Sequence, residues 1–128
     1  NVSSLGALAP LPGFATYAAT KSAMLAFSES LALELERTGV HVQALCPGFT
    51  RTEFQEIEGA DLSMVPKFLW LTPEQVVDAS LRCLGRRVVC IPGLAYRLIA
   101  PLAGPFGRTV QRFVARRRGW CSAPAPDR

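Results

Sequence analysis

The spacing of apolar and polar positions in the first part of the chain predicts a helix between two strands. Residues 15–37 contain no Gly or Pro and are rich in Ala, Leu and Glu, which predicts a long helix that Gly39 ends. Residues 40–46 alternate and then become fully apolar, as is typical of a strand buried in a parallel sheet. Residues 1–3 have the character of the end of a similar strand, and residues 4–14 carry the Gly and Pro of a loop.

A second helix and a third strand follow further along the chain. The sequence Thr72-Pro73-Glu74-Gln75 indicates a helix N-terminus, with Thr72 as the N-cap, Pro at the first helical position and Gln at the third. The helix is expected to extend to residue 84, and residues 86–91 are expected to form a short strand that Pro92-Gly93 closes. The apolar face of this helix consists of Val77, Leu81 and Leu84.

The order strand, helix, strand, helix, strand predicts an α/β fold with a parallel sheet. Because the chain begins with Asn1 rather than Met, inside an expected strand, we expect a fragment that supplies one half of a larger sheet. We divide it into residues 1–92, which form this half-sheet unit, residues 93–121, a basic helical extension, and residues 122–128, a disordered tail.

Composition narrows the class of protein. The 128 residues are 49% hydrophobic and 19% charged, which excludes a disordered or fibrous chain. No apolar run is long enough to span a bilayer, and the first residues do not form a signal peptide, so we expect a cytoplasmic protein. Four cysteines without a C-x-x-C pair and a single His predict reduced thiols and no metal site.

Charge is unevenly distributed along the chain. Residues 1–81 hold 4 basic and 9 acidic side chains, whereas residues 82–128 hold 10 arginines and one acidic residue, Asp127. Helices are expected over residues 94–102 and 106–118, and the second carries an apolar stripe beside crowded arginines. That segment could be a helix docked on the domain with solvated arginines, or a helix that makes peripheral contact with a membrane surface. Nucleic-acid binding is not expected, because the rest of the chain is acidic and no fold for it is recognisable.

One pair of side chains at the start of the long helix can carry chemistry. Tyr17 and Lys21 are four residues apart and therefore share a helix face. A neighbouring ammonium stabilises a phenolate, which would let Tyr17 give and take a proton. Ser4 and Pro47-Gly48 each follow the carboxyl end of an expected strand, where ligands bind in open α/β sheets. The sequence thus predicts that these residues share one crevice.

Three segments resemble successive motifs of the short-chain dehydrogenase/reductase family, in the family's order and at its usual separations. They are Asn1-Val2-Ser3-Ser4 with Gly6, Tyr17-Ala18-Ala19-Thr20-Lys21-Ser22-Ala23 and Pro47-Gly48-Phe49-Thr50-Arg51-Thr52. The resemblance covers residues 1 to about 92. It implies the C-terminal half of a Rossmann-type doubly wound parallel sheet with additional C-terminal helices. The family's glycine-rich phosphate loop would precede Asn1, so we expect the fragment alone to be inactive.

The resemblance also implies roles for individual residues. Tyr17 would be the general acid/base of a reversible hydride transfer between nicotinamide and a carbonyl or alcohol, and Ser4 would hold the substrate oxygen against the phenol. Lys21 would bind the nicotinamide ribose and favour the ionised form of Tyr17. Ser3 is not expected to be the catalytic serine, because alternation along the strand turns it away from Ser4.

The cofactor implied is NADP or NAD, with a slight preference for NADP by analogy with carbonyl-reducing members of the family. Tyr17 and Lys21 would contact it, together with a loop whose members are Pro47, Gly48, Phe49, Thr50 and Thr52. In that loop the backbone of Phe49 and Thr50 would meet the carboxamide, and the Thr52 hydroxyl would bond polar groups of the cofactor.

The sequence also leads to expectations about binding partners and to an alternative function. The expected substrate is a small apolar carbonyl or alcohol, and the small residues of helix 15–37 indicate pairing with a second copy of the chain, although they also permit ordinary packing. The alternative is a non-catalytic fragment or a peripheral membrane-interacting protein that retains the family pattern. The presence of Ser4, Tyr17 and Lys21 together favours the enzyme.

Overall fold

The structure, a computed structural model, describes residues 1–10, 13–52 and 65–103. Predictions that fall on other residues, including the basic helix over 106–118 and the tail over 122–128, lie outside the described residues.

Three segments run parallel, with β1 in the middle. β1 (Ala44–Leu45) pairs in parallel with β2 (Val89–Cys90), and on its other side Leu45 forms a parallel bridge with Val2. The backbone N–H of Ser3 donates to Leu45 at 2.8 Å, and the N–H of Leu45 donates to Asn1 at 2.9 Å. The predicted parallel α/β arrangement is therefore confirmed.

Both strands are shorter than the sequence predicts. Residues 40–43 do not belong to β1, because the backbone hydrogen bonds to the β2 segment begin only where the Ala44 N–H donates to the Val88 carbonyl. Val40 is accordingly 55% exposed. Before β2, the N–H groups of Arg86 and Arg87 bond back to the carbonyl of Cys83 and so belong to a turn. The apolar pattern predicts the position of each strand, but the length of a strand depends on how many of its residues can form backbone hydrogen bonds with an adjacent strand.

The long helix is α1 (Ala15–Glu34), which ends before the predicted residue 37. Hydrogen-bonded turns follow it, and Gly39 reverses the chain with a φ of +80°, a backbone conformation that Gly adopts without steric cost. Ser28 on its buried face donates to the Met24 carbonyl at 2.7 Å and accepts from the Asn1 side chain at 2.9 Å. The helix is thereby fastened to the N-terminal strand segment.

The second helix, α3 (Pro73–Cys83), begins as the sequence predicts. The Thr72 hydroxyl accepts from the Gln75 N–H at 3.3 Å, and the Gln75 side chain accepts from the Thr72 N–H at 3.0 Å. The predicted apolar face is not packed in the structure, because its members, Val77, Leu81 and Leu84, are 54%, 65% and 50% exposed. Val76 packs inward instead, and Ser80 bonds the buried Gln43 through both its hydroxyl and its carbonyl.

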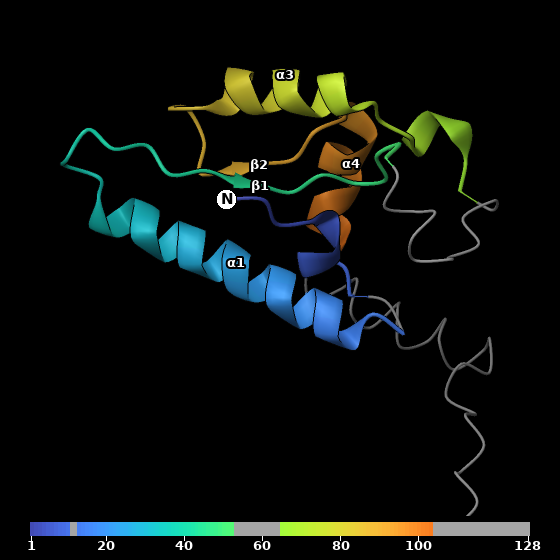
Figure 1. The fold of residues 1–128 in the computed structure, drawn as a ribbon, viewed down its shortest axis with the longest axis horizontal. Coiled ribbons are helices and arrows are strands. Elements are labelled where there is room, and N and C mark those ends of the chain that lie inside the picture. The colour runs from blue at the N-terminus through green and yellow to red at the C-terminus, as the bar shows by residue number, and fades with distance from the viewer. Residues whose placement is uncertain (11–12, 53–64, 104–128) are drawn as a thin grey trace, which may run out of the picture.

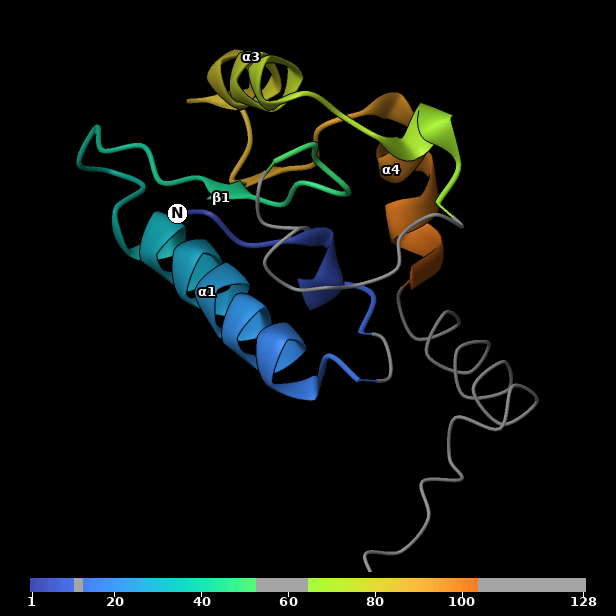
Figure 2. The same cartoon turned by 45° about the vertical axis from the view of Figure 1, so that its right-hand side comes forward.

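A short helix, α4 (Leu94–Ile99), follows β2 and continues into a 3₁₀ turn over Ala100–Ala103, which confirms helical structure near 94–102. Figures 1 and 2 show α1 and α3 on opposite sides of the strands, with α4 beside one end of them. Between them lies a small core of Leu25, Ala44 and Cys46, against which Ala7, Leu8, Val89 and Ile91 pack.

Candidate active site

Two adjacent serines follow the N-terminal strand segment and point in different directions. Ser3 is 2% exposed, and its hydroxyl donates to the Lys21 carbonyl at 2.7 Å. Ser4 is half-buried in an extended conformation and caps a 3₁₀ turn (Leu5–Ala7), its Oγ accepting from the Gly6 N–H at 3.0 Å. The hydroxyl proton of Ser4 remains available to an oxygen acceptor, because Oγ serves only as acceptor in that bond.

The predicted Tyr and Lys pair forms on the first turns of α1. The Lys21 ammonium lies 5.8 Å from the centroid of the Tyr17 ring, and both side chains are half-buried. Lys21 Nζ donates to the Val2 carbonyl at 3.2 Å, which holds the charge at the end of the strand segment. The Phe14 ring packs edge-on against Tyr17, with centroids 6.4 Å apart.

Gly6 lies next to both the Ser4 hydroxyl and the Tyr17 ring. A Cβ placed at Gly6 would lie 3.2 Å from Tyr17 Cε1 and 3.4 Å from Ser4 Oγ, so the ring edge and the hydroxyl border the same small space. A side chain at Gly6 would therefore press on both groups. The structure brings Ser4, Tyr17 and Lys21 together at the carboxyl end of the N-terminal strand segment.

The Pro-Gly loop lies against the serine loop. The N–H of Leu5 donates to the Pro47 carbonyl at 2.9 Å, which joins the chain after Ser4 to the chain after β1. Gly48 is packed so closely that a Cβ there would lie 2.2 Å from Cζ of Tyr96, a residue that is only 3% exposed. Only glycine, which has no Cβ, can lie this close to the Tyr96 ring.

The rest of the loop is held by backbone bonds to the segment before α3. The N–H of Arg51 donates to Leu71 and the N–H of Leu71 donates to Phe49, both at 2.9 Å, and the Thr50 hydroxyl donates to Gly48 at 3.1 Å. The Phe49 ring packs against Trp70 with centroids 5.7 Å apart. These contacts fix the predicted cofactor loop as far as Arg51, and Thr52 follows as an exposed residue.

The Phe49 amide already has a protein partner, which the sequence analysis did not anticipate. It donates to the Tyr96 hydroxyl at 3.1 Å, and that hydroxyl donates in turn to the Leu69 carbonyl. Burial raises the pKa of the Tyr96 phenol, which keeps it protonated as a bridge. Tyr96 is thus a loop-supporting residue that the sequence analysis missed, and its only signal was an aromatic residue closely following Pro92-Gly93.

The cysteines of the described residues are free thiols, as predicted. Burial raises the pKa of Cys46, although contacts with Ser3 and the Ser4 backbone partly oppose the rise, and burial raises the pKa of Cys90 to about 12. Neither thiol is therefore a nucleophile at neutral pH.

Within residues 1–10, 13–52 and 65–103, no group of His, Cys, Asp or Glu could hold a metal ion. None of the helices in that part of the chain is both long and apolar enough to cross a membrane.

Known proteins with similar sequences are dehydrogenases and reductases. Residues 1–62 match the family model described as short chain dehydrogenase. The chain is 35% identical over 78 residues to a 3-oxoacyl-[acyl-carrier-protein] reductase of Synechocystis, covering 59% of the chain and 32% of that protein. It is 39% identical over 56 residues to the human dehydrogenase/reductase SDR family member 4, covering 44% of the chain and 20% of that protein.

Solved structures are similar as well. A 7beta-hydroxysteroid dehydrogenase superposes with a TM-score of 0.73 at 28% identity, covering 88% of the chain and 45% of that structure. A short-chain dehydrogenase from Sphingobium yanoikuyae in complex with NADPH superposes with a TM-score of 0.65 at 30% identity, covering all of the chain and 46% of that structure. The chain spans less than half the length of each of these proteins. These similarities support membership of the chain in the short-chain dehydrogenase/reductase family.

Proposed function

We propose that the chain carries the catalytic residues of an NAD(P)-dependent oxidoreductase that interconverts a carbonyl and an alcohol. The observation that carries the proposal is the meeting of three functional groups at one strand end. Ser4 Oγ and the Tyr17 ring edge border Gly6, and the Lys21 ammonium lies 5.8 Å from the ring centroid. The loop beginning at Pro47 is joined to this end by the bond from Leu5.

The donors and acceptors at this end fit a nicotinamide nucleotide. An ammonium has three N–H donors, and Lys21 uses one on the Val2 carbonyl, which leaves donors for ribose hydroxyls. The Phe49 amide is bound to Tyr96, but among the described residues its carbonyl accepts from Leu71 alone and keeps a lone pair for a carboxamide N–H. The bound nicotinamide would supply or accept the hydride.

The protein's own part is to hold an oxygen and move a proton. In the reducing direction, the Ser4 hydroxyl donates a hydrogen bond to the carbonyl oxygen and the Tyr17 hydroxyl gives it a proton as negative charge develops. The Lys21 ammonium stabilises the phenolate that remains. In the oxidising direction, the same phenolate takes the proton from the alcohol. The edge-on Phe14 ring, 38% exposed, offers an apolar wall beside the phenol and supports an apolar substrate.

The similar proteins support this reading. Those compared above are named as reductases or dehydrogenases, and one of the solved structures is a complex with NADPH. We propose the same cofactor class here, with NADP preferred to NAD by that analogy.

The experiment is the Tyr17→Phe substitution in a form of the protein that binds NAD(P)H, because the change keeps the ring and removes only the exchangeable proton. Hydride transfer, followed by nicotinamide absorbance, should fall by about a hundredfold or more, since positioned acid–base groups typically contribute that much. NAD(P)H binding should persist. Ser30→Ala is the matched control, because it removes an exposed hydroxyl from the same helix away from the site.

The alternative, a non-catalytic or peripheral membrane-interacting protein, predicts a different outcome. In that case the protein would neither bind NAD(P)H nor lose any activity through the Tyr17→Phe substitution. The segment on which a membrane role was based, 106–118, lies outside the described residues.

We further propose that α1 pairs with α1 of a second copy. Ala18 faces the core, but Ala19, Ala23 and Phe27 lie along one exposed face, with Phe27 57% exposed. Small side chains beside an exposed aromatic ring permit close helix contact. Replacing Ala23 with Arg should shift the protein to the monomer in light scattering, and an unchanged mass would contradict this pairing.

A further inference from the structure

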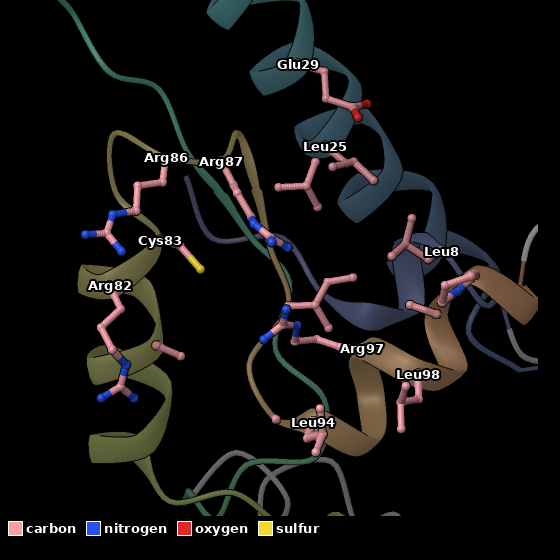
Figure 3. Close-up of a pocket in the computed structure, with 16 residues that line it drawn as sticks. Leu8, Leu25, Glu29, Arg82, Cys83, Arg86, Arg87, Leu94, Arg97 and Leu98 are labelled. Atoms are coloured by element: carbon pink, nitrogen blue, oxygen red, sulfur yellow. The ribbon is translucent and has the colours of Figure 1, made fainter.

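A second cavity lies away from the proposed active site. It has a volume of about 870 Å³ and opens between α1, α3 and α4 beside β2 (Figure 3). Neither Ser4, Tyr17 and Lys21 nor the loop 47–52 lines it. Its size lies within the range of small-molecule pockets in proteins. We call it the arginine cavity after four of its lining residues, Arg82, Arg86, Arg87 and Arg97.

The charge of the arginine cavity is one-sided. The four arginines come from α3, from the turn before β2 and from α4, whereas Glu29 of α1 is the one carboxylate among the described residues of the lining. In Figure 3, Arg87 and Arg97 extend into the space between α3 and α1, and Arg82 and Arg86 lie on its α3 side. No ion pair joins these guanidinium groups to a carboxylate of the described residues. The excess positive charge favours an anionic ligand, and guanidinium groups bind phosphate through paired N–H donors.

Aliphatic side chains form the rest of the lining. Leu94 and Leu98 of α4 are 70% and 67% exposed, although both border the cavity. Leu25, from the core, closes the side nearest α1. An alkyl chain that covers these exposed apolar side chains removes their surface from water, which lowers the free energy of the complex.

We propose that the arginine cavity binds a single-chain amphipathic phosphate, an alkyl or acyl chain that ends in a phosphate group. The phosphate lies among the guanidinium groups, and the chain covers Leu94 and Leu98. The charge and the aliphatic wall occur in one cavity, so neither inorganic phosphate nor a neutral alkyl chain uses all of it. The site is separate from hydride transfer and does not depend on the proposed function.

The test uses dodecyl phosphate, below its micelle concentration, as the probe for titration calorimetry on the full chain. We expect saturable binding of a single ligand, at least roughly tenfold tighter than inorganic phosphate or dodecanol, because each of these lacks one half of the contacts. Binding of inorganic phosphate as tight as that of dodecyl phosphate would overturn the proposal.

Substitutions of the arginines and of a leucine test the phosphate contact and the alkyl contact separately. Arg97→Gln and Arg82→Gln should each weaken dodecyl phosphate binding by roughly tenfold, since hydrogen bonds to charged groups contribute that much. Leu98→Asn, at an exposed position, should weaken dodecyl phosphate but leave inorganic phosphate unchanged. Arg37→Gln is the charge-matched control, because Arg37 is exposed and does not line the cavity. Equal losses in Arg37→Gln and Arg97→Gln would overturn a specific site.

The source of the ligand is settled by a second arm with phosphatidylcholine vesicles that contain phosphatidic acid. Co-sedimentation that Arg97→Gln abolishes supports the site and identifies a bilayer as the source. Co-sedimentation that is absent or unchanged in the variant, together with dodecyl phosphate binding, supports the site for a dissolved ligand. If the chain binds no probe and Arg97→Gln instead disrupts self-association in sedimentation analysis, the cavity is an interface between copies and the proposal is wrong.

Discussion

The proposed active site and the arginine cavity differ in how their polar groups are satisfied. At the active site, the chain itself supplies partners at short distances: Ser4 to Gly6, Lys21 to Val2 and Phe49 to Tyr96. In the arginine cavity, four guanidinium groups face one carboxylate and form no ion pair within the described part of the chain. A site that is held by its own hydrogen bonds is organised before its ligand arrives, whereas unpaired charge around an apolar wall needs a ligand to complete it. Substitutions should therefore affect the two regions in opposite ways.

The largest effect is expected where the active-site loop is packed most tightly, at Gly48. The Gly48→Ala substitution places a Cβ 2.2 Å from the Tyr96 ring, which is buried and cannot easily move. Overpacking of this kind should lower the free energy of unfolding by about 3 kcal/mol and displace the cofactor loop. Urea denaturation and NAD(P)H titration measure the two consequences.

A second change at the contact gives the control for Gly48→Ala. Adding Tyr96→Leu to it removes the ring and should restore part of the stability. Gly13→Ala, where an added Cβ would meet no atom of the described residues beyond its chain neighbours within 4 Å but φ is +85°, should cost only the backbone strain, about 1 kcal/mol. Similar losses for Gly13→Ala and Gly48→Ala would show that packing against Tyr96 is not what requires glycine.

The next contrast separates the two adjacent serines. Ser3→Ala removes a buried hydroxyl bonded to Lys21 and should lower the free energy of unfolding by about 1 kcal/mol, with little effect on turnover by folded protein. Ser4→Ala should reduce turnover by about a hundredfold and stability much less, because its hydroxyl is proposed to hold the reacting oxygen. Thermal unfolding and initial rates on the same preparations check both. The reverse pattern would assign the reacting oxygen to Ser3.

The features that the sequence predicts correctly depend on local signals. The cap at Thr72 and the turn at Gly39 need only neighbouring residues, and the spacing of Tyr17 and Lys21 fixes their shared helix face. The carboxyl-end rule for parallel strands then brings Ser4 and Pro47 together once the alternation of strands and helices is recognised.

The features that the sequence does not predict depend on contacts between distant residues. Tyr96 bonds Phe49 across 47 positions, and nothing near either residue indicates that pairing. The packed face of α3 follows from the bonds between Ser80 and Gln43 rather than from the apolar stripe through Leu81. The arginine cavity was equally hidden, because its charges come from two helices and a turn that meet only in the folded chain.

A smaller effect is expected at alkaline pH, from Tyr96. Burial raises the pKa of this phenol above its ordinary 10.0, although the bond from the Phe49 N–H partly opposes the rise. The folded protein therefore holds the proton more strongly than the unfolded chain. The resulting stability is fully present below pH 10 and is lost as the pH rises through the folded-state pKa. Tyr96→Phe should be less stable than the parent protein at neutral pH by about 1 kcal/mol but should lose less stability on the alkaline side. Urea denaturation at several pH values measures this, and parallel alkaline losses in both proteins would contradict it.

The smallest effect, and the one that separates the two regions most clearly, is expected from removing one charge of the arginine cavity. Arg86 is exposed, shares the lining with three other arginines and has no ion pair to a carboxylate of the described residues. Arg86→Gln should therefore leave the free energy of unfolding within about 0.5 kcal/mol of the parent value. Any change should be a gain at low salt that fades as salt is added, because the substitution relieves repulsion between like charges and salt screens that repulsion. Thermal unfolding at low and high ionic strength measures it. A clear loss of stability that salt does not alter would mean that Arg86 has a structural partner in the folded protein, and that this cavity, like the active site, is organised before any ligand arrives.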